Sequence, residues 1–187
     1  MKTIIVFASS SGTNAEKIIT FFGAIRTAAV KCVYCNNPSA AVINRATRLR
    51  VPIRVFNRSE YQNNVLEELI SANPDLIVLA GLLWKIPKSY IQTFPDKIIN
   101  IHPALLPKYG GKGMYGKHVF DAIVMNGEAE TGITIHYVNE YYDKGAIIFQ
   151  AKTVVAITDT AADVAKKTHQ LEHEHFALQI HQLLDQQ

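Results

Sequence analysis

Two polar side chains in the middle of the sequence have the types and the spacing to act together on one ligand atom. Asn100 and His102 lie two residues apart in Asn100-Ile101-His102-Pro103, at the end of an apolar run. In an extended chain, residues so spaced project from the same side, about 7 Å apart. An asparagine amide is a neutral hydrogen-bond donor, and an imidazole donates or carries a proton near neutral pH. The alternative is that both are ordinary buried polar residues with partners in the fold.

A carboxylate further along the chain, Asp143, is a candidate partner for His102. It lies in Tyr141-Tyr142-Asp143-Lys144-Gly145, a short loop expected between two late strands. If this loop folds back over His102, the carboxylate favours the imidazolium and raises the pKa of His102. Asp143 is otherwise only a turn residue ahead of Gly145, which is a common arrangement.

The segment Ser9-Ser10-Ser11-Gly12-Thr13-Asn14 has the composition of a phosphate-binding turn. It joins an apolar run to a helical pattern, so free backbone N–H groups and the positive end of the helix dipole face outward there. It lacks the lysine of a P-loop and the three glycines of a dinucleotide fingerprint, which favours a monophosphate as the ligand. A plain helix cap without a ligand is the alternative.

Three further motifs are better explained without a ligand. Residues 111–116 match G-x-G-x-x-G but follow a loop rather than a strand, so a mobile flap beside His102 is expected instead of a dinucleotide site. The His/Glu cluster over 169–175 is not H-E-x-x-H and favours a solvated helix face, so no metal is predicted. Cys32 and Cys35 stand three residues apart in a predicted strand, which points them to opposite faces and argues against a redox or metal pair.

Hydrophobic patterns predict an alternation of strands and helices that would bring these segments together. The expected strands are 2–8, 30–35, 53–56, 76–80, 97–101, 132–138 and 146–154. The expected helices are one after residue 14, 40–49, 60–71 with Ser59 as its N-cap, 88–93, and 160–184 with its cap at Thr158 or Thr160. The fold class is therefore α/β, a Rossmann-like open, mostly parallel sheet with helices on both faces and a late antiparallel strand pair. Ligands gather at the carboxyl ends of such strands, which selects the loops 9–14, 81–87, 102–116 and 139–145.

Composition and charge indicate a globular protein that binds small molecules. The 187 residues fit one domain, 1–187, of ordinary composition with 48% hydrophobic and 19% charged residues. The net charge of +3 comes from 19 basic and 16 acidic residues without Lys/Arg runs, which argues against nucleic acid and for a small anionic ligand. The N-terminal apolar run and the stretch 76–84 are too short for a signal peptide or a membrane span. With only two cysteines, the expected compartment is the cytoplasm, where thiols stay reduced.

The segment Asn100–Pro107 resembles the N-I-H-P-S-L-L-P signature of the folate-dependent formyltransferases. The segments 79–81, 11–14 and 142–146 also fall in that family's order, so the resemblance covers nearly the whole chain. It implies that a formyl group passes from 10-formyltetrahydrofolate, a co-substrate, to an amine. Members that formylate tRNA or hydrolyse the folate carry a further domain, so this length favours glycinamide ribonucleotide, in purine synthesis. Hydrolysis of 10-formyltetrahydrofolate and non-catalytic folate or nucleotide binding remain alternatives, and small-molecule partners and a monomer or homodimer are expected.

The resemblance also implies a role for each candidate binding residue. Gly12, Thr13 and Asn14 would hold the substrate phosphate, and Glu172 would contact the ribosyl glycinamide. The expected folate site is formed by Arg58, Leu83, Trp84, Lys85, Ile86 and Asn100. Trp84 stands where many members have arginine, which suggests stacking or apolar packing instead of a charged contact. The segment 110–116 and Ala104 also depart from the family pattern.

The mechanism implied by the resemblance is direct attack of the amine on the formyl carbon. Asn100, His102 and Asp143 match the family's catalytic trio. The Asn100 amide and a protonated His102 would stabilise the oxyanion of the tetrahedral intermediate, and Asp143 would keep the imidazole charged and oriented. No metal and no covalent enzyme intermediate are needed.

Overall fold

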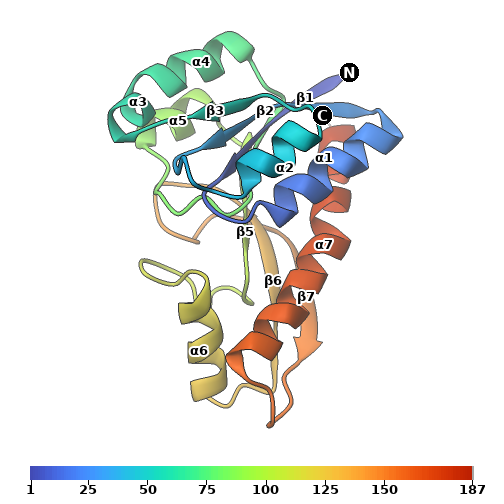
Figure 1. Cartoon of the computed structure of the whole chain (residues 1–187). Helices are drawn as coiled ribbons and strands as arrows, with labels where there is room; N and C mark the ends of the chain where they lie inside the picture. The colour runs from blue at the N-terminus through green and yellow to red at the C-terminus, as the bar shows by residue number, and fades with distance from the viewer. Residues whose placement is uncertain (187) are drawn as a thin grey trace.

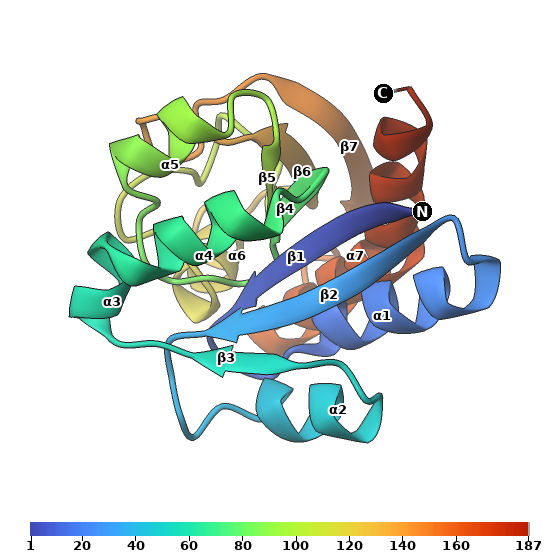
Figure 2. The same ribbon diagram turned by 90° about the horizontal axis from the view of Figure 1, so that it is seen from above.

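A single seven-stranded sheet organises residues 1–186, which are the residues that the computed structural model describes (Figures 1 and 2). The strands are β1 Lys2–Ala8, β2 Ala28–Cys35, β3 Ile53–Val55, β4 Leu76–Leu79, β5 Ile98–His102, β6 Glu130–Tyr137 and β7 Ile147–Val154. They lie in the order β3-β2-β1-β4-β5-β6-β7, with β4 at the centre. Pairs from β3 to β5 are parallel, whereas β6 and β7 run antiparallel to their neighbours, which confirms the predicted fold class.

Helices cover both faces of this sheet. They are α1 Thr13–Ile25, α2 Val42–Arg48, α3 Arg58–Gln62, α4 Asn64–Ala72, α5 Lys88–Thr93, α6 Lys117–Met125 and α7 Ala161–Asp185. Because successive strand residues point to opposite faces, Ile4 and Val6 pack under α1, α2 and α7, while Ile5 and Phe7 pack under α3, α4 and α5. Figure 2 shows α1 and α2 on one side of the sheet and α4 and α5 on the other.

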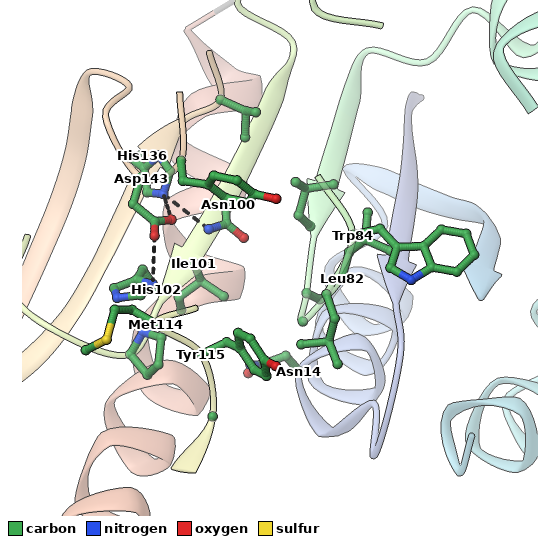
Figure 3. A pocket seen from close by; sticks show the side chains of 18 of the residues that line it. Asn14, Leu82, Trp84, Asn100, Ile101, His102, Met114, Tyr115, His136 and Asp143 are labelled. Carbon is green, nitrogen blue, oxygen red and sulfur yellow. Dashed lines mark hydrogen bonds and ion pairs between the residues drawn. The ribbon is translucent and has the colours of Figure 1, made fainter. Parts of the chain in front are cut away.

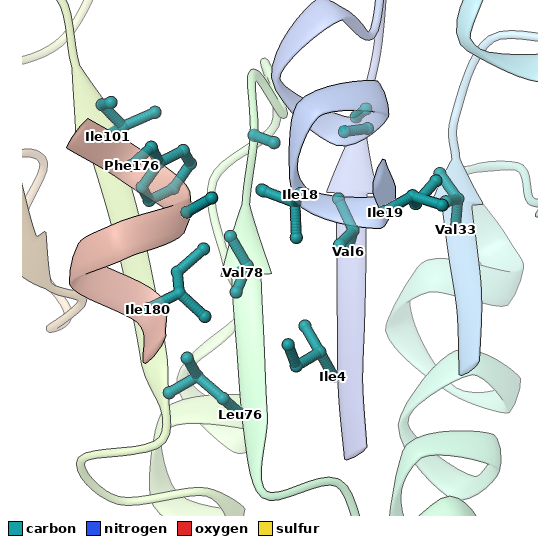
Figure 4. Packing of buried hydrophobic residues seen from close by; sticks show 14 of the residues in the cluster. Ile4, Val6, Ile18, Ile19, Val33, Leu76, Val78, Ile101, Phe176 and Ile180 are labelled. Carbon is teal, nitrogen blue, oxygen red and sulfur yellow. The ribbon is translucent and has the colours of Figure 1, made fainter. Parts of the chain in front are cut away.

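The largest of the three buried apolar clusters described in residues 1–186 joins the N-terminal strand to the C-terminal helix. Phe176 and Ile180 of α7 pack over Val78 of β4, beside Ile4 and Ile18, and all are buried (Figure 4). Full burial of one such side chain stabilises the fold by about 1.5–3 kcal/mol. The long final helix is therefore part of the structure that holds the carboxyl edge of the sheet in place.

Two helices differ from the sequence prediction. The helix expected over 60–71 is broken at Asn63 into α3 and α4, and its cap is Asn57 rather than Ser59. Asn57 Oδ1 accepts from the Glu60 N–H at 3.0 Å while Glu60 Oε2 accepts from the Asn57 N–H at 2.9 Å, a reciprocal capping box. Helix α6 was not predicted at all, because the glycine-rich segment before it hides the helical spacing of Val119, Phe120 and Ile123.

The two cysteines lie on opposite faces of β2, as predicted. Cys35 is buried with the α1 and α2 core, and Cys32 packs against the α4 and α5 core, both as free thiols. Burial raises the pKa of Cys32 to about 11, so its thiol stays protonated near neutral pH. Among residues 1–186, no helix has the length and apolar character needed to cross a membrane.

Candidate active site

A cavity of about 270 Å³ opens where β1, β4 and β5 end (Figure 3). All four loops that were selected from the sequence contribute residues to its wall, and so do His169 and Glu172 of α7. The structure thus brings together segments from positions 10 to 172 around one space. Three parts of the cavity wall differ in the groups that they offer: the side formed by α1 and α7, the side formed by α3 to α5, and the β5–β6 edge.

Backbone groups dominate the α1 side of the cavity. Gly12 is the N-cap of α1 in a left-handed conformation with φ 73°, and Gly12, Thr13 and Asn14 all line the cavity. A Cβ on Gly12 would lie 2.3 Å from Val42 Cγ2, so α2 packs directly against this turn. Arg45 of α2 also donates from Nε to the Ser11 carbonyl at 2.9 Å. The turn therefore has a fixed backbone, with the N-terminus of α1 directed at the cavity.

A buried carboxylate from α7 closes this side. Glu172 is only 6% exposed, and its Oε2 accepts from Asn14 Nδ2 at 2.8 Å. Burial raises the pKa of Glu172 above its ordinary value, although the Asn14 donor and nearby His169 oppose the shift. The prediction of a solvated His/Glu face is wrong for Glu172, because its position on α7 turns it toward Asn14 while Glu174 faces solvent.

The β5–β6 edge holds the candidate catalytic side chains. Asn100 and His102 both line the cavity from β5, and Asp143 lies over them from the loop after β6 (Figure 3). His102 Nδ1 is 3.7 Å from Asp143 Oδ2. His102 Nε2 is 2.7 Å from the Tyr109 carbonyl, which only accepts, so Nε2 carries a proton.

Burial decides the charge of His102. Its side chain is 4% exposed, and desolvation lowers the pKa of His102 below its ordinary value. Asp143 and the Tyr109 carbonyl pull this pKa upward without overcoming desolvation. Asp143 therefore raises the pKa of His102 as expected, but desolvation outweighs it, so the imidazole is neutral at pH 7 with an unprotonated Nδ1.

Asp143 lies beside both His102 and His136 at this edge. Its Oδ2 accepts from the Gly111 N–H at 2.9 Å, and its Oδ1 is 3.6 Å from His136 Nε2. Burial alone would raise the pKa of Asp143, but His136, His102 and the Gly111 N–H together lower it below its ordinary value. Asp143 is thus ionised at neutral pH beside a neutral His102.

Sequence analysis missed one buried residue of the site, His136. It is 2% exposed, lines the cavity, and lies directly opposite Asn100 in the antiparallel β5–β6 register. A signal was present in the predicted strand 132–138, where Thr134 and His136 alternate with isoleucines and so share one face. Whether that face lies beside Asn100 and His102 depends on the pairing of β5 with β6, which cannot be read from the sequence alone.

The α3 to α5 side is apolar and aromatic. Leu83, Trp84, Lys85 and Ile86 line the cavity as predicted for this loop. Trp84 packs at 5.8 Å from the Phe56 ring and 5.6 Å from the Tyr61 ring. The expected apolar packing of Trp84 is therefore observed.

Arg58 does not line the cavity but contacts Trp84, which does. Its guanidinium lies 4.6 Å from the centre of the Trp84 ring, a cation–π contact on the ring face. Across the opening, Lys85 Nζ lies 5.3 Å from the Tyr142 ring. Both basic side chains are solvent-exposed at the rim of the apolar wall.

The glycine-rich segment 110–116 lies beside His102. Gly111, Met114, Tyr115 and Gly116 line the cavity, and the segment leads into α6. Its mobility stays a prediction. Within residues 1–186, no three His, Cys, Asp or Glu side chains form a group that could hold a metal ion.

Comparisons with known proteins agree with one another. The family model described as "Formyl transferase" matches residues 2–180. The phosphoribosylglycinamide formyltransferases of Haemophilus influenzae and Bacillus subtilis are 37% and 36% identical, over 96% and 98% of this chain and 86% and 95% of theirs. The crystal structure of glycinamide ribonucleotide transformylase 1 from Geobacillus kaustophilus superposes with a TM-score of 0.88 at 35% identity, covering 98% of this chain and 99% of that one.

Proposed function

Because this chain belongs to the formyl transferase family, we propose that it transfers a formyl group from 10-formyltetrahydrofolate to the amine of glycinamide ribonucleotide, in purine synthesis. The observation that carries the proposal is the meeting of Asn100, His102 and Asp143 at one cavity that also has a backbone anion turn and an apolar wall. A ribonucleotide phosphate and a folate need those two walls on either side of the reacting atoms.

The two substrates are assigned to different sides of the cavity. Gly12, Thr13 and Asn14 hold the phosphate at the N-terminus of α1, and Glu172 contacts the ribosyl glycinamide. The folate lies against the loop 83–86, with Asn100 at its formyl end and Arg58 at the rim. These roles follow the family resemblance, and the cavity geometry is compatible with them.

The neutral state of His102 changes the proposed order of proton transfers. As the amine attacks the formyl carbon, His102 Nδ1 accepts the amine proton, and the resulting imidazolium is stabilised by Asp143 at 3.7 Å. The Asn100 Nδ2 group donates to the oxyanion of the tetrahedral intermediate. The imidazolium then returns its proton to the departing folate nitrogen as the C–N bond breaks. No metal takes part in this scheme.

One assay separates this function from its alternatives. The purified protein is incubated with 10-formyltetrahydrofolate, with and without glycinamide ribonucleotide, and the released folate, formyl product and formate are measured. We expect folate release only when the ribonucleotide is present, in equal amount to the formylated product. Formate release without the ribonucleotide would identify a hydrolase, and tight binding without turnover would identify a sensor.

Partners and compartment follow from the same proposal. Small-molecule substrates rather than nucleic acid suit a cavity of this size and polarity. A cytoplasmic location and a monomeric or homodimeric state stay predictions.

A further inference from the structure

His136 lies behind Asn100, one strand away from the reacting atoms. The β5–β6 register pairs Asn100 with His136 and His102 with Thr134, so all four side chains belong to one face of the sheet edge. In Figure 3, dashed lines join His136 to both Asn100 and Asp143, on the side away from Trp84. His136 is more deeply buried than His102, at 2% against 4% exposure.

The hydrogen bonds of His136 determine which of its nitrogens carries the proton. Nδ1 is 2.8 Å from the Tyr137 carbonyl, and because a carbonyl oxygen only accepts, Nδ1 carries the hydrogen. In the neutral ring, Nε2 is then an acceptor. Asn100 Nδ2 lies 3.2 Å from it and donates, so the Asn100 amide is held with its nitrogen toward β6.

Close packing fixes the position of the Tyr137 carbonyl that accepts from His136. Gly145 approaches the end of β6 so closely that a Cβ there would lie 1.6 Å from the Tyr137 carbonyl oxygen and 3.5 Å from His136 Nδ1. The loop that carries Asp143 therefore runs against the same carbonyl that accepts from His136. Asp143 Oδ1 lies 3.6 Å from His136 Nε2, which is beyond hydrogen-bond distance, so Asn100 is the hydrogen-bond partner of Nε2.

We propose that His136 is a positioning residue that holds the Asn100 amide in the orientation needed to donate to the formyl oxygen. One N–H of Asn100 Nδ2 is used by His136 Nε2, and the second N–H of the same nitrogen is left for the oxyanion. Without His136, the amide turns over and presents its carbonyl oxygen, which repels an oxyanion. This inference rests on the proposed function, because it assumes acyl transfer at Asn100.

Two substitutions test the inference. His136→Phe keeps the ring volume and removes both nitrogens, while His136→Gln keeps an acceptor for Asn100 near the position of Nε2. We expect His136→Phe to lower kcat about tenfold or more, with KM for both substrates unchanged within about twofold, because orientation and not binding is lost. His136→Gln should recover part of the loss. His175→Phe, a histidine replacement on α7 that faces Phe149, is the matched control and should keep the wild-type kcat.

A double-mutant cycle isolates the path through Asn100. In an Asn100→Ala background, His136→Phe should change kcat by less than about twofold, because the group that it positions is gone. An equal loss in both backgrounds, or a rise in both KM values with kcat unchanged, overturns the inference. If His136→Phe does not fold, the same cycle is run with His136→Leu, which also lacks an acceptor for Asn100.

The outcome is separable from that of the proposed function. If the wild-type protein releases formate without the ribonucleotide, the proposed acceptor is wrong. The same cycle, measured on formate release, then still tests whether His136 acts through Asn100, because water attack also forms an oxyanion on the formyl oxygen.

Discussion

The turn over 9–14 and the β5–β6 edge lie at the same cavity but are built in opposite ways. The turn over 9–14 offers backbone groups, and its shape depends on Gly12 packing against Val42. The β5–β6 edge offers side chains, with Asn100, His102 and His136 contributed by two strands and fixed by their register. A site made of backbone groups is lost when the local backbone conformation changes. A site made of side chains is lost when any one of those side chains is replaced.

Substitutions in the two regions should therefore have different effects on turnover, substrate binding and stability. Changes at the β5–β6 edge remove a reacting group and lower turnover while substrate still binds. Changes at the turn distort the binding of one substrate and weaken the fold at the same position. The four experiments below proceed from the largest expected effect to the smallest.

His102→Ala removes the proton acceptor at the β5–β6 edge. We expect kcat to fall by about 10²–10³ or more, with KM for glycinamide ribonucleotide unchanged within a few-fold, because the turn over 9–14 is intact. Steady-state kinetics with each substrate varied in turn measures both constants. His175→Ala on α7 is the control, and near-normal turnover by His102→Ala would remove His102 from the mechanism.

Gly12→Ala places a Cβ 2.3 Å from Val42 Cγ2 at a position with φ 73°. We expect the free energy of unfolding to fall by about 1–3 kcal/mol and KM for the ribonucleotide to rise, with kcat retained. Urea unfolding and steady-state kinetics check the two parts. Gly23→Ala is the matched control, because a Cβ there meets nothing within 4 Å and an alanine in α1 should stabilise the fold slightly. A wild-type KM in Gly12→Ala would contradict the phosphate role of the turn.

Asp143→Asn tests the electrostatic coupling at the β5–β6 edge. Burial lowers the pKa of His102, and the charge of Asp143 partly offsets this lowering. Removing the Asp143 charge should therefore lower the pKa of His102 further. His102 must be neutral to accept the amine proton, and activity is lost as pH falls through its pKa. The acid limb of the kcat/KM profile therefore lies below the ordinary histidine range in the wild type and moves to still lower pH in Asp143→Asn. A limb that does not move would show that the two groups are uncoupled, and a limb that moves upward would contradict the sign of the coupling.

Trp84→Leu tests the apolar wall and should have the smallest effect. It removes the ring under Arg58 and its packing with Phe56 and Tyr61. An exposed cation–π contact contributes only about 0.5–1 kcal/mol, so we expect KM for the folate to rise a few-fold. KM for the ribonucleotide should stay constant, and an equal rise in both would place Trp84 outside the folate side.

Most of the sheet and the choice of loops followed from the sequence, because buried parallel strands are near-continuous apolar runs and ligands gather where they end. Helix α5 over Lys88–Thr93 and the Thr160 cap of α7 were also predicted correctly. The sequence did not predict the break at Asn63 or helix α6, because short helices next to asparagine or glycine clusters have weak hydrophobic periodicity.

The sequence predicted most of the residues that meet at the cavity, but it did not predict the shift in the pKa of His102. Asn100 and His102 could be paired by strand spacing, whereas His136 required the β5–β6 register. The direction of the His102 pKa shift could not be predicted, because it depends on the balance between burial and Asp143, and neither is visible in the sequence. Glu172 lines the cavity although its charged neighbours predicted a solvated face, since a helix can bury one carboxylate while it exposes the next.

The hydrogen bond from Asn14 to Glu172 joins residues 158 positions apart. At ordinary translation speeds of 5–20 residues per second, the ribosome adds the second partner roughly 8–30 s after the first. A nascent chain can therefore form the turn at 9–14 long before its carboxylate wall exists. Substrate binding should appear only at the end of synthesis, when α7 docks and completes the cavity.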